Sequence, residues 1–169
     1  MKKIIYSPFG VSMLLALLFS ACTFDNQETL SPNPTPTPGN SSVVIWSGPT
    51  LTFSKAAGAD PSLEENQDRL TDNVWITRGN RGGQIYNAAE ENSANKNTSP
   101  AGTQWARGTT ANLSNLRFND FRATVGQPKN IVGQDLVMFL VKDSIYIDIK
   151  ITDWLGGQVG GFTYERSTE

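Results

Sequence analysis

Hydrophobic and polar residues alternate along one segment near the end of the chain. Between residues 145 and 152, four isoleucines at the odd positions alternate with Tyr146, Asp148, Lys150 and Thr152. A period of two places successive side chains on opposite faces of a strand, whereas a helix would scatter the isoleucines around its surface. The segment is therefore predicted to be a half-buried antiparallel strand whose isoleucines face the core.

Shorter apolar runs predict further strands. Residues 136–141 are apolar at every position, which is typical of a central strand covered on both faces. Residues 42–46 and 51–54 flank the turn signal Ser47-Gly48-Pro49, and they are predicted to form a hairpin. A second hairpin is predicted across the sequence GNRGG. The other predicted strand segments are residues 73–78, 84–89, 103–110, 116–119 and 162–166.

Two short helices are predicted between these strands. Ser62 and Glu65 have the spacing of a capping box, and Leu63 and Leu70 are available to dock that helix. Asn119 is a candidate cap for a second helix that Gly126 would end. About eight short strands with turn-rich connections favour an all-β fold. We expect an antiparallel β-sandwich, jelly-roll-like, with one or two short helices.

The N-terminus has the pattern of an export signal. Lys2 and Lys3 precede a mostly apolar run that ends at Ala21, and such a segment is typical of a processing signal that is not part of the folded domain. The sequence Leu18-Phe19-Ser20-Ala21-Cys22 resembles the lipobox of bacterial lipoproteins. That resemblance implies a signal peptide over residues 1–21, cleavage before Cys22 and acylation of Cys22, for which palmitate is a typical chain. The alternative is a plain secretory signal with an incidental cysteine.

A tether follows the expected anchor. Residues 22–41 include SPNPTPTPGNS, and proline-rich segments of this kind favour an extended, semi-rigid conformation. The chain thus divides into a signal peptide (1–21), a Pro/Ser-rich tether (22–41) and a β-sandwich domain (42–169). Thr23 stands where an inner-membrane retention signal would have aspartate, so resemblance to other lipoproteins implies the outer membrane of the cell envelope. The sequence does not distinguish the cell-surface face of that membrane from its periplasmic face.

Composition excludes several kinds of site. The chain has no histidine, and its single cysteine is the expected lipid attachment point. Ser-His-Asp and Cys-His catalysis, an internal disulfide and zinc sites built on Cys or His are therefore excluded within this chain. After loss of Lys2 and Lys3, 12 basic residues (14 − 2) would face 16 acidic ones. That balance argues against a nucleic-acid partner.

Two longer motifs suggest a family. NQDRLTDNVWITRGNRGGQIYNAA (residues 66–89) and DSIYIDIKITDWLGGQVGGFTYERST (residues 143–168), with SPAGTQWARGTT between them, resemble an uncharacterised group of secreted and lipid-anchored bacterial proteins, many from Bacteroidota and marine bacteria. The resemblance extends over nearly all of the domain. It implies an exported envelope protein and carries no catalytic residues.

Exposed aromatic rings are candidates for sugar binding. Trp154 continues the predicted polar face of Tyr146, which makes it the first candidate for an exposed platform, with Trp75 as a second. Coverage of Trp154 by the glycine-rich loop that follows is the alternative. Arg78 is a candidate to clamp a carboxylate, although pairing with a structural acid is the commoner role of arginine.

Acidic residues offer two further kinds of site. Asp60, Asp68 and Asp72 lie in one polar stretch and are candidates for Ca²⁺ ligands, the alternative being a solvated loop. No other cofactor is expected. Glycosidases need two converging carboxyl groups, and Asp148 is a candidate, although a solvated sheet face explains it more simply.

These patterns lead to three hypotheses of function. The first is a non-catalytic binding or adhesion module for a glycan or another envelope protein, held to the membrane by its lipid. The second is a carboxylate-dependent glycan hydrolase or lyase. The third is a purely structural envelope protein, which would bind no ligand.

Overall fold

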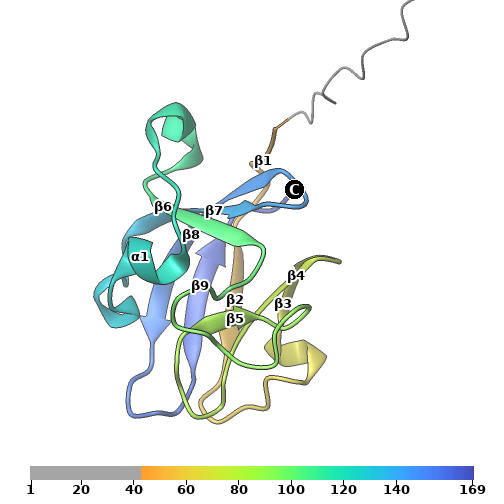
Figure 1. Cartoon of the computed structure of the whole chain (residues 1–169), viewed down its shortest axis with the longest axis vertical. Coiled ribbons are helices and arrows are strands. Elements are labelled where there is room, and N and C mark those ends of the chain that lie inside the picture. Colours follow the sequence, from red (N-terminus) through yellow and green to blue (C-terminus); the bar gives the residue numbers. More distant parts are fainter. Residues whose placement is uncertain (1–42) are drawn as a thin grey trace, which may run out of the picture. The chain divides into compact units, whose positions relative to one another are not determined.

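The computed structural model describes residues 43–169. The predicted signal peptide, Cys22 and the tether lie outside these residues. Strands dominate the described part of the chain and form two antiparallel sheets, with one short α-helix, α1 (Phe121–Val125), and short 3-10 helices between them (Figure 1). The predicted all-β sandwich is confirmed. No helix within residues 43–169 is both long and apolar enough to cross a bilayer.

The larger sheet has six strands, and β8 is its longest. The order is β2–β9–β8–β7–β6, with β1 also beside β8. Two strands pair with the same edge of β8. β1 pairs in parallel with the first residues of β8, and β9 pairs antiparallel with its later residues. The strands are β1 (Val44–Trp46), β2 (Leu51–Lys55), β6 (Thr103–Arg107), β7 (Asp135–Leu140), β8 (Ile145–Trp154) and β9 (Phe162–Arg166).

The smaller sheet consists of three strands joined by two consecutive hairpins. These strands are β3 (Asp68–Thr71), β4 (Val74–Arg78) and β5 (Ile85–Asn87), and the short helix η1 (Glu64–Asn66) precedes them. The hairpin predicted across GNRGG is confirmed as β4–β5. Gly82 and Gly83 in this connection have φ of +90° and +85°, a region that favours glycine because a Cβ atom is strained there.

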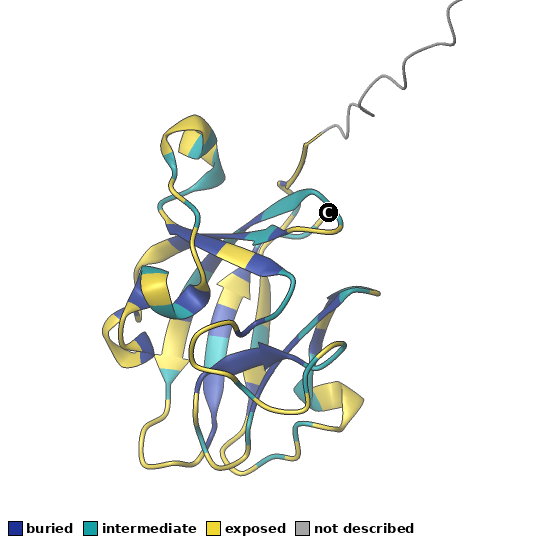
Figure 2. Ribbon diagram, viewed as in Figure 1, coloured by how far each residue is buried: buried dark blue, intermediate teal, exposed yellow. Residues whose placement is uncertain are grey.

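The hydrophobic core forms between the two sheets, and Figure 2 shows buried residues on the strands and mostly exposed ones on the connecting loops. Ile147, Ile149 and Ile151 are buried, which confirms the alternation predicted for β8. β7 is buried on both faces from Leu136 to Met138, as its continuous apolar pattern predicts. The smaller sheet contributes Leu70, Val74, Ile76 and Ile85 to the same core.

The first two strands do not form the predicted hairpin. β1 pairs with β8, with Val44 opposite Ile145, and β2 pairs with β9, with Leu51 opposite Arg166. The segment between them passes the end of β9, where the Gly48 amide donates to the Thr168 carbonyl at 2.8 Å. The predicted turn is also wrong, because only a bend at Gly48 separates the two strands. Each strand instead satisfies its backbone hydrogen bonds against a different strand of the larger sheet.

Three local predictions also need correction. The capping box gives only the 3-10 helix η1 without a side-chain cap; Leu63 is 47% exposed, and Leu70 lies on β3 instead. The segment 116–119 contributes an isolated bridge between Asn119 and Trp105 and no strand. Helix α1 follows Asp120, one residue later than predicted, and ends at Gly126 with φ of +68° as predicted.

Candidate functional site

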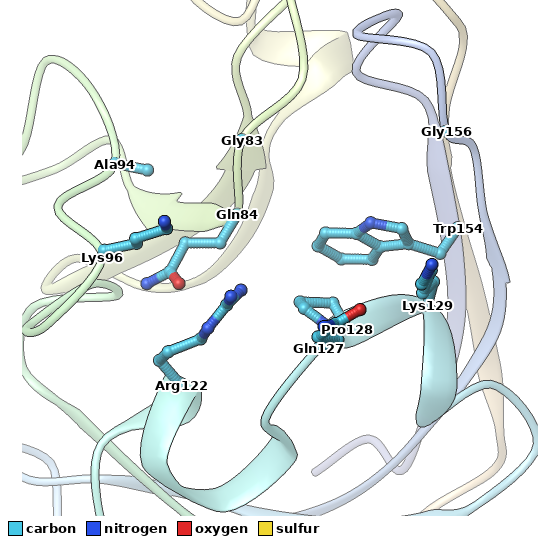
Figure 3. A pocket seen from close by; sticks show the side chains of 10 residues that line it. All are labelled: Gly83, Gln84, Ala94, Lys96, Arg122, Gln127, Pro128, Lys129, Trp154 and Gly156. Carbon is cyan, nitrogen blue, oxygen red and sulfur yellow. The ribbon is translucent and has the colours of Figure 1, made fainter.

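A pocket of about 340 Å³ opens beside the end of β8 (Figure 3). Its volume lies at the lower end of the range for small-ligand sites, roughly 300–1,000 Å³. Four parts of the fold contribute to it: β8 and the loop after it, the loops on either side of β5, α1, and the 3-10 helix η3 (Pro128–Asn130) with the residue before it. The lining residues are Gly83, Gln84, Ala94, Lys96, Arg122, Gln127, Pro128, Lys129, Trp154 and Gly156.

Trp154 lines this pocket because β8 contains a bulge. The pairing of β8 with β9 shifts between Ile151 and Asp153, so that Trp154 stands opposite the buried Phe162. An extra residue in one strand moves every following side chain to the other face. Trp154 therefore lies on the isoleucine face, 6.0 Å from Phe162 between ring centroids, and not on the face of Tyr146 as the alternation predicts.

Arg78 makes a cation–π contact with the Trp154 ring. Its guanidinium carbon lies 3.9 Å from the indole centroid. Arg78 Nε donates to the Gly83 carbonyl at 2.8 Å, and Nη1 donates to the carbonyls of Leu155 at 3.0 Å and Gly161 at 2.6 Å. Burial lowers the pKa of Arg78 from its ordinary value. The side chain thus joins β4 to both ends of the β8–β9 loop, which is a structural role next to the pocket.

Gln84 brings an unsatisfied acceptor to the pocket. Its side chain is only 4% exposed, and Nε2 donates to the carbonyls of Asn95 at 3.1 Å and Ser99 at 2.8 Å. These two acceptors determine which way round the amide lies. Oε1 is buried and has no hydrogen-bond partner among residues 43–169. A buried acceptor without a hydrogen bond lowers the stability of the fold, so we expect this oxygen to accept a hydrogen bond from a bound molecule.

The Glu91 carboxylate bridges the two ends of the loop after β5. Glu91 Oε2 accepts from the amides of Asn87 and Ala101, each at 2.9 Å, and Oε1 accepts from the Ser99 hydroxyl. Both ends of the loop are thereby tied to β5. This arrangement positions the Asn95 and Ser99 carbonyls that orient Gln84, and it carries Lys96 to the pocket edge.

The structure does not bring the other predicted aromatic residues to this pocket. Trp75 faces away from the core on β4, where its Nε1 donates to the Thr71 carbonyl at 3.0 Å and Arg69 lies 4.3 Å above its ring. Tyr146 stacks on Phe139 on the outer face of the larger sheet, with ring centroids 4.3 Å apart. Of the four predicted ligand-binding residues, Trp154 and Arg78 are in contact, and Trp75 and Tyr146 lie elsewhere.

The three aspartates proposed for Ca²⁺ are not gathered into a cluster. Asp68 is buried and paired with Arg166, Asp60 accepts from the amide and hydroxyl of Ser62, and Asp72 is exposed in the β3–β4 turn. The part of the chain from 43 onward contains no group of three or more His, Cys, Asp or Glu side chains that would suit a metal ion.

A second depression, of about 350 Å³, carries the carboxylates of the larger sheet. Asp135, Asp148 and Glu165 line it together with Lys150 and Arg166. Two of these acids have partners: Asp135 pairs with Lys150 at 2.9 Å, and Asp148 accepts from the amide and the hydroxyl of Thr110, each at 2.7 Å. These residues form a charged patch on the larger sheet, and most of its charged groups already have an ion-pair or hydrogen-bond partner.

The chain matches no protein-family model, no curated protein and no solved structure.

Sequence reasoning found Trp154 and missed its partners in the pocket. One signal was available: from residue 92 to residue 134 the only acid is Asp120, and the basic residues are Lys96, Arg107, Arg117, Arg122 and Lys129. Such an imbalance indicates a basic surface. Gln84 had no signal of its own, because an amide becomes notable only when the fold buries it.

Proposed function

We propose that this chain is a lipid-anchored protein of the bacterial outer membrane whose β-sandwich domain binds a glycan in the Trp154 pocket without catalysis. The observation that carries the proposal is the convergence of Trp154 and Gln84. An aromatic ring beside a buried, unpaired amide oxygen suits a ligand with both an apolar ring face and hydroxyl donors. Saccharides combine these two properties.

The walls of the pocket support binding more than catalysis. Its lining includes no aspartate or glutamate, whereas glycoside hydrolysis needs a pair of carboxyl groups. The side chains around it are held from behind: Arg78 by three carbonyls and Gln84 by two. Such support reduces the cost of ordering the site when a ligand binds.

The binding test compares two tryptophans in the full-length protein, purified in detergent. Trp154→Phe should weaken binding to the wild type's best glycan on a glycan array by at least about tenfold, since the loss of one well-placed contact costs about 1.4 kcal/mol or more. Trp75→Phe is the matched control, because Trp75 lies on β4 away from the pocket. Thermal unfolding of both variants checks that each is folded.

Two results would overturn the binding proposal. A wild-type protein that binds no glycan would favour the purely structural envelope role. Equal effects of the two substitutions would show that Trp154 is not part of the site. Membrane attachment is tested separately: Cys22→Ser should abolish palmitate labelling and release the protein from the outer-membrane fraction, and retention there would contradict the lipid anchor.

A glycan-active enzyme is the second candidate, and the depression holding Asp135, Asp148 and Glu165 is the observation that favours it. It predicts that purified protein releases new reducing ends or unsaturated products from a bound glycan. Glu165→Gln should then abolish product release, with Glu169→Gln at the chain end as the control. Intact glycan after prolonged incubation would remove this candidate.

A further inference from the structure

Three cationic side chains and no acidic side chain line the Trp154 pocket. Arg122 comes from α1, Lys129 from η3, and Lys96 from the loop after β5. Figure 3 shows Lys96, Gln84 and Arg122 approaching the same space from the side opposite Trp154. Within residues 43–169, none of the three cations takes part in a salt bridge.

Unbalanced cations around a concave site favour an anion. Cations that share one site repel each other, and a bound negative charge turns that repulsion into charge-assisted hydrogen bonds. The neighbouring cation Arg78, in contact with the indole, adds to the same electrostatic field, although its Nε and Nη1 are already bonded to carbonyls. The chain as a whole is acidic, with 14 basic and 16 acidic residues, so the positive site runs against the overall charge.

Gln84 narrows the class of anion. Its Oε1 is an acceptor and its amide donors are already used, so the ligand must supply a donor as well as a negative charge. A fully ionised inorganic sulfate has no hydrogen to donate. A sugar ring that carries both hydroxyl groups and an acidic group meets both requirements.

Trp154 limits how such a ring lies. The Arg78 guanidinium lies 3.9 Å from the indole centroid, so only the part of the ring that lines the pocket is left for the ligand. At about 340 Å³, the pocket is small for a drug-sized ligand and suits one or two sugar rings.

Resting on the binding function proposed above, we infer that the ligand is an anionic saccharide. Arg122 and Lys96 bind its carboxylate or sulfate, and Lys129, which Figure 3 shows on the Trp154 side of the pocket, adds positive charge. One of its hydroxyl groups donates to Gln84 Oε1, and its ring packs against Trp154. Carboxylate and sulfate groups would both be bound in this way, and the experiment below distinguishes them.

The test uses matched pairs of polymers with the full-length protein in detergent. Oligogalacturonate is compared with its methyl ester, and dextran sulfate is compared with dextran. The charged member of at least one pair should bind at least about tenfold more tightly than its neutral partner, and its affinity should fall as salt is raised. The pair that responds identifies carboxylate or sulfate as the group recognised.

Variants assign the effect to the pocket. Arg122→Gln and Lys129→Gln should each weaken binding of the charged polymer several-fold and leave binding of the neutral one unchanged. Arg117→Gln is the control, since Arg117 lies outside this pocket. Trp fluorescence spectra and thermal unfolding verify that the variants keep the fold.

The outcomes separate this inference from the proposed function. Neutral saccharides that bind through Trp154 as tightly as charged ones would overturn the anionic class alone. Full competition by inorganic sulfate at equal concentration would overturn the saccharide, since a simple anion would then suffice. No binding of any saccharide would overturn the proposed function itself.

Discussion

Asp68 on β3 and Arg166 on β9 form a buried two-point ion pair that joins the two sheets. Arg166 Nε donates to Asp68 Oδ2 at 2.7 Å and Nη2 donates to Oδ1 at 3.0 Å, and the two side chains are only 8% and 7% exposed. Tyr164 adds a hydroxyl that donates to Oδ2 at 2.6 Å. The carboxylate proposed from the sequence as a metal ligand is thus fully used as a structural group.

Asp68→Asn should destabilise the domain strongly. The substitution leaves the Arg166 charge buried without its counter-charge, which typically costs roughly 3–5 kcal/mol. Asp135→Asn is the matched control, because it breaks the exposed pair with Lys150 and should cost no more than about 1 kcal/mol. The free energy of unfolding is measured with urea. A loss below about 1 kcal/mol for Asp68→Asn would contradict the role of this pair.

Tyr164→Phe should remove a stabilising contribution that depends on pH. Burial, and then the neighbouring Asp68 carboxylate, raise the pKa of Tyr164 well above its ordinary value of 10.0. Above about pH 10 the unfolded chain releases the phenolic proton while the folded protein keeps it, so the free energy of unfolding falls as pH rises. At neutral pH the substitution should cost about 1.5–3 kcal/mol, the worth of a hydrogen bond to a charged group.

The measurement is the difference in unfolding free energy between the wild type and Tyr164→Phe as a function of pH. That difference should be constant below about pH 9 and should shrink above about pH 10, because only the wild type has this titrating group. Absorbance of tyrosinate in the folded protein gives a second readout. A difference that stays constant at high pH would contradict the raised pKa.

Gly160→Ala should be more damaging than Gly157→Ala, although both glycines have almost the same backbone conformation. Their φ angles are +69° and +68°, where an alanine costs about 1–2 kcal/mol. A Cβ on Gly160 would also overlap the Gly79 carbonyl of the β4–β5 turn, whereas Gly157 faces open space. Overpacking should add about 1–3 kcal/mol at Gly160 alone. Thermal unfolding compares the two, and equal losses would argue against close contact between these loops.

Glu91→Gln should loosen the loop after β5. The neutral side chain keeps one acceptor oxygen for three donors that now bond a carboxylate, so we expect a loss of about 2–4 kcal/mol. The preceding residue provides the control: Glu90 pairs with Lys142 on the surface, and Glu90→Gln should cost less than about 1 kcal/mol. Urea unfolding gives both values.

The Glu91 variant also tests how the pocket is built. The Asn95 and Ser99 carbonyls that orient Gln84 lie in the same loop, so Glu91→Gln should weaken binding of the best glycan while Glu90→Gln leaves it unchanged. Unchanged affinity together with lost stability would show that the loop's order does not matter to the site.

Several features of the fold could be predicted from the sequence because they depend on residues that are close together in the chain. The alternation at residues 145–151, the apolar run of β7 and the β4–β5 turn each follow from local backbone geometry, so the strands and the sandwich could be predicted. The missing histidine and the single cysteine likewise needed no coordinates. The lipid anchor predicted at Cys22 lies outside the described residues and remains a prediction.

Tertiary structure alone decided the partners and the pocket. The pairing of β1 with β8 and of β2 with β9 depends on backbone hydrogen bonds between segments far apart in the sequence, which no local pattern contains. One bulge in β8 moved Trp154 from the predicted outer face to the pocket, because a single extra residue inverts the alternation beyond it. Burial then turned Gln84, an ordinary amide in the sequence, into an acceptor that requires a partner.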